Sequence, residues 1–250
     1  METIALYPFS TWIIILLASF FIGLGKAGLK GIDMLSVTLM AFVFGSKAST
    51  GIVLPLLCIS DIAAVSYYNR HAKWNHFWKI TPWMIVGILI GIYVGKDMNE
   101  ALFRKIMAVI ILFTIIIILL MELRKSKTVP TNPLFVASTG LAAGITTMLG
   151  NLAGAFSNLY FLAMRLEKND FIGTAAWIFL IMNLFKLPFQ IFLWKNISIE
   201  SIKIDALLLP TLAIGFLLGL KLVDKVKEKD YRRLIIILTL IGSLLMLFKK

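Results

Sequence analysis

The sequence predicts an all-α polytopic membrane protein made of two homologous repeats. Hydrophobic residues make up 60% of the 250 residues and charged residues only 15%, whereas a soluble domain carries about 25% charged residues. The second half of the chain also repeats the first. When the sequence is shifted so that Gly45 is aligned with Gly173, other glycine, proline and charged residues are aligned with identical ones: Pro82 with Pro210, Gly87 with Gly215, Gly91 with Gly219, Glu100 with Glu228 and Arg104 with Arg232. Internal duplication in an apolar chain is typical of transporters whose site lies between the repeats, near the bilayer midplane.

Apolar runs, most of them separated by charged loops, are the candidate membrane helices. In the first half they cover 4–25, 32–44, 48–68, 80–95 and 106–121, and in the second half 134–149, 152–164, 171–194, 204–222 and 234–248. The basic, proline-containing stretch 122–133 is the expected linker. Repeat one then covers about 4–122 and repeat two about 134–250, within one membrane transporter domain.

The first two runs of each half are expected to form a re-entrant helical hairpin. The stretch 134–164 has no charged residue and is broken by Gly150, Asn151 and Gly154. A continuous helix of this length would measure about 46 Å, beyond the ~30 Å hydrocarbon core, and two full spans would need about 40 residues. The stretch 12–44 has the same build, with its break at 25–31. Each repeat would therefore contain one hairpin and three spanning helices.

Hairpins that make no net crossing would make the two repeats inverted. The loops 69–79, 122–133 and 222–233 then share one face, and together they carry more Lys and Arg than the loops of the other face. The positive-inside rule places the richer face in the cytoplasm and both termini outside, in the cell (inner) membrane. If each hairpin were instead one kinked crossing, the repeats would be parallel.

The two hairpin tips are the expected binding site for a small anion. Glycine lets the backbone turn sharply and approach a ligand, and the half-helix that leaves each tip starts with free N–H groups and a partial positive charge. The expected substrate-binding residues are Lys26, Gly28, Lys30 and Gly31 in the first tip and Gly150, Asn151 and Gly154 in the second. An ordinary loop outside the membrane is the alternative for the lysine-bearing tip.

Two ionisable residues, Asp61 and Lys186, lie well inside long apolar runs. Intramembrane charges cost on the order of 2.5–3.5 kcal/mol on insertion scales, so they usually pair or line a polar path. The repeat shift places the two residues at nearly equivalent positions, and we expect them to be partners or to share one polar path. Asn183 and Gln190 flank Lys186 at helical spacing. A coupling or gating role for these four residues and a purely structural ion pair are both compatible with the pattern.

Matched turns begin the long helices of both repeats and contain Ser46 and Thr174. We expect these hydroxyls to be helix N-caps. They would also coordinate an oxyanion if the turns reached the site, and for that reason both are candidate substrate-binding residues.

The sequence contains no motif that indicates an enzyme, a cofactor-binding protein or a nucleic-acid-binding protein. The single cysteine, Cys58, allows neither a disulfide framework nor a thiolate metal site, and there is no HExxH, GxSxG, P-loop or dinucleotide fingerprint. The net charge of +12 comes from Lys and Arg residues in short loops between apolar runs. This placement is typical of the loops of a membrane protein, so we expect a lipid bilayer and not nucleic acid as the partner. We expect no catalytic residue, metal or cofactor.

Five segments resemble the TauE/SafE family of sulfite-exporter-like permeases: 25–31, 48–61, 147–154, 171–177 and 183–188. The resemblance covers nearly the whole chain and implies a membrane permease with duplicated repeats that moves sulfite, sulfonates or related small organic anions. We therefore expect a secondary transporter that works by alternating access, with protons as the coupling ion. An anion channel, or a structural or assembly membrane protein without transport, is the alternative.

Overall fold

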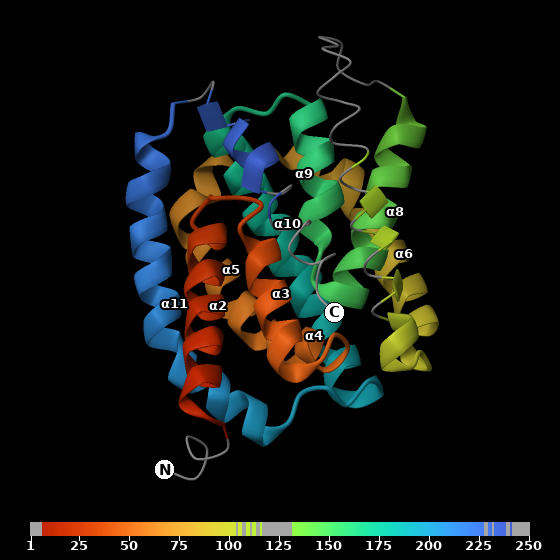
Figure 1. Ribbon diagram of the computed structural model, residues 1–250. Helices are drawn as coiled ribbons and strands as arrows, with labels where there is room; N and C mark the ends of the chain where they lie inside the picture. Colours follow the sequence, from red (N-terminus) through yellow and green to blue (C-terminus); the bar gives the residue numbers. More distant parts are fainter. Residues whose placement is uncertain are drawn as a thin grey trace.

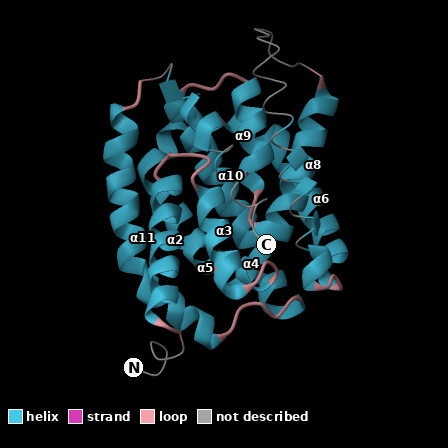
Figure 2. Cartoon of the chain, in the orientation of Figure 1, coloured by secondary structure: helices cyan, strands magenta, loops and turns pink. Residues whose placement is uncertain are grey.

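The protein is a bundle of helices, described here from a computed structural model that covers residues 7–103, 105–106, 109–110, 112–113, 116, 132–227, 230–231, 233–238 and 241. Within these ranges the regular secondary structure is helical throughout (Figure 2). The helices with assigned bounds are α2 (Phe9–Lys26), α3 (Asp33–Phe44), α4 (Ala48–Ile52), α5 (Leu54–Tyr68), η1 (Asn69–His71), α6 (Trp74–Lys96), α8 (Pro133–Gly150), α9 (Ala153–Ala163), α10 (Lys168–Pro188), η2 (Phe189–Leu193) and α11 (Ile199–Lys225).

Six helical segments of the described chain are long and apolar enough to cross a membrane: Phe9–Lys26, Ala48–His71, Trp74–Lys96, Pro133–Gly150, Lys168–Leu193 and Ile199–Lys225. A helix satisfies its backbone hydrogen bonds internally, which is what a chain in hydrocarbon requires. Large side chains such as Tyr93 and Phe192 stay exposed on the outside of the bundle, at 81% and 77% of their surface. These features make the chain a multi-pass membrane protein. The runs predicted at 106–121 and 234–248 lie largely outside the described residues.

Two of the predicted runs are divided in the structure, and a proline accompanies each division. The run 48–68 separates at Val53 into α4 and α5, with Pro55 in the first turn of α5, where its missing N–H costs no hydrogen bond. The run 171–194 changes at Pro188 from the α-helix α10 to the π-helical turn η2. Proline removes one backbone donor and crowds the preceding turn, and π-turns occur mostly as single inserted turns, frequently at functional sites.

Two antiparallel helix pairs approach each other from opposite ends of the bundle. The pair α2–α3 turns through residues 27–32, and its open end faces the end of the bundle where the chain begins (Figure 1). The pair α8–α9 opens toward the opposite end (Figure 1). Its turn lies at Asn151, which adopts the left-handed conformation with φ 55°, a conformation that asparagine tolerates better than most residues. The turn between α8 and α9 therefore falls within the stretch Gly150 to Gly154, where the sequence predicted a break in the helix.

Glycines bring the first arm of each pair against a helix of the other half of the chain. A Cβ atom at Gly215 of α11 would lie 2.2 Å from the carbonyl oxygen of Phe20 in α2. In the matching contact, a Cβ atom at Gly87 of α6 would lie 2.3 Å from the carbonyl oxygen of Leu141 in α8. Small residues allow such backbone approach between membrane helices. The glycines at the matched repeat positions 87 and 215 thus allow close packing of the helices.

Candidate functional site

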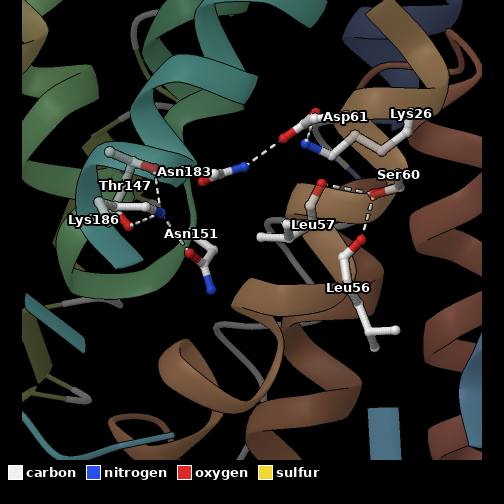
Figure 3. A network of polar contacts seen from close by, with 9 residues as sticks. All are labelled: Lys26, Leu56, Leu57, Ser60, Asp61, Thr147, Asn151, Asn183 and Lys186. Atoms are coloured by element: carbon white, nitrogen blue, oxygen red, sulfur yellow. Dashed lines mark hydrogen bonds and ion pairs between the residues drawn. The ribbon is translucent and has the colours of Figure 1, made fainter. Parts of the chain in front are cut away.

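A buried carboxylate joins the first tip to the second half of the chain. Asp61 of α5 has no exposed surface. Its Oδ1 lies 2.5 Å from the Lys26 Nζ at the end of α2, and its Oδ2 accepts a hydrogen bond of 2.6 Å from the Asn183 amide of α10 (Figure 3). Both carboxylate oxygens are therefore bonded, one to a charge and one to an amide, which is the arrangement that makes a buried carboxylate tolerable.

The second tip is bound by the other intramembrane charge. The Lys186 Nζ donates to Asn151 Oδ1 at 2.8 Å and to the hydroxyl and carbonyl oxygens of Thr147 at 3.0 and 3.1 Å (Figure 3). Lys186 is 1% exposed, and three acceptors match the three donors of an ammonium group. The Asn151 amide in turn donates to the Thr50 carbonyl oxygen at 2.9 Å, which ties the second tip to α4 of the first half.

Of the two arrangements expected for Asp61 and Lys186, a direct ion pair or a shared polar path, the direct ion pair is not formed. Each residue binds the tip of its own half, because the Asp61 carboxylate is already occupied by Lys26 and Asn183, while the Lys186 ammonium is occupied by Thr147 and Asn151. Asp61 and Lys186 are instead connected through the helix α10. Asn183 and Lys186 lie less than one turn apart on that helix and bind Asp61 and the second tip respectively.

The polar side of α10 continues beyond Lys186. The Gln190 amide, in the π-turn η2, donates to the Thr50 hydroxyl at 3.2 Å, and Gln190 Oε1 accepts from the Asn196 amide at 3.1 Å. Asn196 also donates to the Lys47 carbonyl oxygen at 3.2 Å. Gln190 is 1% exposed, so these are interior hydrogen bonds. The predicted polar face formed by Asn183, Lys186 and Gln190 thus binds α4 and α5 of the first half of the chain and the second tip.

The first tip holds a second lysine in a different situation. Lys30 is 2% exposed, and its Nζ forms no hydrogen bond or ion pair with the described part of the chain, although the carboxylates of Asp33 and Asp61 are its nearest opposite charges. Its Nζ lies 5.4 Å from the ring centroid of Phe179 in α10, and the Lys26 Nζ lies 5.0 Å from the same ring. A cation above an aromatic face gains on the order of 0.5–2 kcal/mol, far less than a carboxylate or several carbonyl groups would provide.

Glycines and two tyrosines fix the course of the first tip. Gly28 and Gly31 have φ values of 125° and 100°, which side chains with a Cβ rarely adopt. The Tyr68 hydroxyl donates to the Ala27 carbonyl oxygen at 2.8 Å, and the Tyr231 hydroxyl donates to the Gly28 carbonyl oxygen at 2.6 Å. The lysines at 26 and 30 are buried and so are not the solvated residues of an ordinary loop, which was the alternative for this tip.

The two helix pairs touch at the start of α3 and the start of α9. Asp33 Oδ1 accepts from the Gly31 N–H at 2.8 Å, and its Oδ2 lies 2.8 Å from the place where a Cβ atom of Gly154 would stand. A side chain at 154 would therefore collide with the carboxylate. Gly154 thus permits a close approach by a carboxylate of this chain, while the approach of a substrate anion stays a prediction.

Ser46 and Thr174 are not helix N-caps, contrary to the expectation. The residue before α4 is Lys47, and α10 begins at Lys168, well before Thr174. The start of α4 is bound instead by Glu100, whose carboxylate accepts from the Ser46 and Lys47 N–H groups at 2.6 and 3.1 Å. The Thr174 hydroxyl accepts from the Lys73 N–H at 2.8 Å. These contacts hold loops and do not bring either hydroxyl to the tips.

Comparison with known proteins decides the family. The family model described as "Sulfite exporter TauE/SafE" matches residues 13–246, nearly the whole chain. The chain belongs to the TauE/SafE family. This confirms the resemblance seen in the sequence and makes the protein a membrane permease of an anion-exporter family. No curated protein and no solved structure matches the chain.

For this TauE/SafE protein, the network contains residues that the sequence did not single out. Thr50 binds Asn151 of the second tip, Thr147 binds Lys186, Phe179 faces both lysines of the first tip, and Asp33 follows that tip directly. Threonine and phenylalanine are too common in membrane helices to be noticed singly. Asp33 offered a signal, since it is a carboxylate two residues after a glycine of the tip. Among the described residues no group of three His, Cys, Asp or Glu side chains could hold a metal ion.

Proposed function

We propose that this protein is a secondary transporter of small anions, with sulfite, organosulfonates and related organosulfur anions as the leading substrates. Membership of the TauE/SafE family supports transport of this class. The observation that carries the choice of an anion is Lys30, a buried ammonium group that forms no hydrogen bond or ion pair with the described residues and lies over the ring of Phe179. Such a group costs several kcal/mol unless it gains a partner, and a small anion would supply the oxygen acceptors that the tip lacks.

The charges around the two tips favour a singly charged substrate. Lys26, Lys30 and Lys186 supply three positive charges, and Asp33 and Asp61 supply two negative charges. The remaining single positive charge would be neutralised by a monoanion. Binding would occur beside Phe179, where Lys26 is held by Asp61 and Lys30 is left to interact with the ligand. The anion would then make no direct contact with the other predicted binding residues, which are Gly150, Asn151, Gly154 and the hydroxyls of Ser46 and Thr174.

The architecture we propose is a pair of inverted repeats, each with a re-entrant hairpin and three spanning helices. Two features support it. The helix pairs α2–α3 and α8–α9 open toward opposite ends of the bundle (Figure 1). The glycine contacts are also matched, since α11 of the second half packs on α2 and α6 of the first half packs on α8. The basic loops would face the cytoplasm of the cell (inner) membrane.

The helix α10 is the element that we expect to couple the two tips during alternating access. It contacts the first tip through Phe179, binds Asp61 through Asn183, and binds the second tip through Lys186. A tilt of α10 would therefore change the surroundings of both tips at once. In this role Asp61, Asn183, Lys186 and Gln190 are gating residues, and protons are the expected coupling ion.

Uptake by proteoliposomes tests the proposal. We would measure saturable uptake of sulfite, thiosulfate, sulfoacetate, taurine and small carboxylates, and then the affinity for the best of them in Lys30→Gln. Loss of a charged hydrogen-bond partner predicts a roughly 10- to 100-fold weaker affinity, corresponding to about 1.5–3 kcal/mol. Lys203→Gln is the matched control, because Lys203 is exposed on α11. Unchanged affinity in Lys30→Gln would move the site away from the first tip.

Counterflow separates a carrier from a channel. A carrier that works by alternating access exchanges unlabelled anion inside for labelled anion outside, so an outward gradient of unlabelled substrate accelerates uptake of the label. Flux that does not saturate and does not respond to the opposing substrate would identify an anion channel. Absence of flux for every anion in the panel would favour a structural or assembly role.

A further inference from the structure

A second buried carboxylate lies outside the tip network. Asp205 of α11 is 3% exposed, and within the described ranges neither of its oxygens has a hydrogen-bond partner. It lies in the span candidate Ile199–Lys225, fewer than two turns from the start of that helix. An ionisable residue inside a membrane span is expensive and is a candidate functional group for that reason.

Asp205 lies on the side of α11 that packs against α2. The residues Asp205, Leu208, Leu212, Gly215 and Gly219 follow one another at spacings of three and four, so they form one stripe of the helix. The later part of this stripe contacts α2 through Gly215 and Gly219. Nearer to Asp205, the Ser19 hydroxyl of α2 donates to the Leu208 carbonyl oxygen at 3.0 Å, and Ile15, Ile22, Met40 and Leu56 form an apolar cluster with Leu208.

Among the described helices that pack on α11, which are α2, α4 and α5, none offers a cation to Asp205. The titratable residue of α2 is Lys26, which is at the far end of the helix and is bound to Asp61. The helix α4 has no titratable side chain, although Lys47 precedes it, and α5 contributes Cys58, Asp61, Tyr67 and Tyr68. On α11 itself the nearest charged residues, Glu200 and Lys203, are exposed. An isolated carboxylate in such surroundings is stable only when it carries a proton.

We propose that Asp205 is a proton-binding site, and that its proton controls how tightly α2 packs on α11. The carboxylate takes a proton from water at the nearby end of α11 to become the neutral acid, and it returns that proton to the same water. With the proton bound, α2 and α11 stay closely packed, as in this structure. When the proton leaves, the charge draws water between the two helices and loosens α2, which ends at Lys26 of the first tip. The assignment of this site to coupling rests on the proposed transport function.

Infrared spectroscopy of the purified protein in lipid nanodiscs tests the proton directly. The wild type should show the carbonyl absorption of a buried protonated carboxylic acid at neutral pH. This absorption should be absent in Asp205→Asn and retained in Asp224→Asn, which removes an exposed carboxylate from the same helix. A spectrum that Asp205→Asn leaves unchanged would overturn the proposal.

Hydrogen–deuterium exchange tests the consequence for α2 and needs no substrate. After correction for the intrinsic pH dependence of exchange, the amides of α2 should exchange at least threefold faster in the wild type and in Asp224→Asn when the pH is raised. Asp205→Asn mimics the protonated acid, so its α2 amides should exchange at one rate across the range. Asp205→Leu provides a second neutral variant if the amide folds poorly. Equal pH dependence in the wild type and both neutral variants would refute the link, whatever the transport assay shows.

Discussion

The Asn183 amide of the second half donates to Asp61 Oδ2 of the first half at 2.6 Å. This bond completes the surroundings of a carboxylate whose other oxygen is bound by Lys26. The two halves of the chain are therefore joined at their centre by a charge that neither half satisfies alone. Because Asn183 lies less than one turn from Lys186, the same helix face carries the contact to the second tip.

Replacing Asn183 with alanine should destabilise the protein by about 1–3 kcal/mol. The change leaves a buried carboxylate oxygen without its donor, and the cost of an unsatisfied buried acceptor is of this size, with more expected for a charged one. Thermal or chemical unfolding of the purified protein in detergent measures it. Asn75→Ala, at an exposed position of α6, should leave stability unchanged. Equal stability of the two variants would show that Asn183 does not support Asp61.

Lys26 and Asp61 should behave as a pair in a double-mutant cycle. Removing one partner leaves an uncompensated buried charge and costs about 3–5 kcal/mol, whereas neutralising both is often nearly neutral. Asp61→Asn and Lys26→Met should each reduce folded yield and stability, and the double variant should recover most of the loss. The parallel cycle of Asp61→Asn with Lys186→Met should be additive, because those residues bind different partners. Rescue in the second cycle and additivity in the first would contradict the structure.

Alanine at Gly144 or Gly215 should destabilise strongly. A Cβ atom at Gly144 would stand 2.1 Å from the carbonyl oxygen of Met84, and one at Gly215 would stand 2.2 Å from the carbonyl oxygen of Phe20. Backbone atoms cannot move aside as a flexible side chain can, so the helices must separate, at a cost of about 1–3 kcal/mol or more. Ser138→Ala, on an exposed position of α8, is the control. Unfolding temperatures of the two glycine variants within error of the wild type would show that these helices are farther apart than in this structure.

Cysteine labelling should place the loops on opposite sides of the membrane in the order that inverted repeats require. In a Cys58→Ala background, Lys73→Cys and Glu167→Cys should react with a membrane-impermeant maleimide from one side, and Asn99→Cys and Lys195→Cys from the other. All four positions are exposed, so reactivity reports sidedness. Labelling of 167 and 195 from the same side would rule out a crossing by α10, and with it the inverted architecture.

The sequence predicted the backbone breaks better than the contacts between helices. The break predicted between Gly150 and Gly154 coincides with Asn151, because a long uncharged stretch interrupted by turn residues admits few other arrangements. The importance of Asp61 and Lys186 was also predictable, since charges inside apolar runs are rare. Their partners were not predictable, because a hydrogen bond between helices depends on helix rotation and depth.

Other features had no distinct signal in one sequence. The division between α4 and α5 at Val53 and the π-turn after Pro188 arise from single prolines, which membrane helices also accommodate without a break. The Thr50 carbonyl oxygen accepts from Asn151 of the second tip and the Thr147 hydroxyl accepts from Lys186, whereas threonines in helices usually bond their own backbone. Asp205 sits within a run that the sequence marks only as apolar.

The packing of α2 on α11 has a consequence for biosynthesis. Gly23 in the second-last turn of α2 meets Leu212 and Gly215 of α11, so the first described helix to leave the ribosome packs against one of the last. At about 5–20 residues per second, the intervening stretch of roughly 190 residues takes on the order of ten to forty seconds to synthesise. During that interval the glycine-containing face of α2 has no α11 to cover it, and α6 likewise precedes its partner α8. Packing of α2 in this bundle therefore waits until α11 has been synthesised.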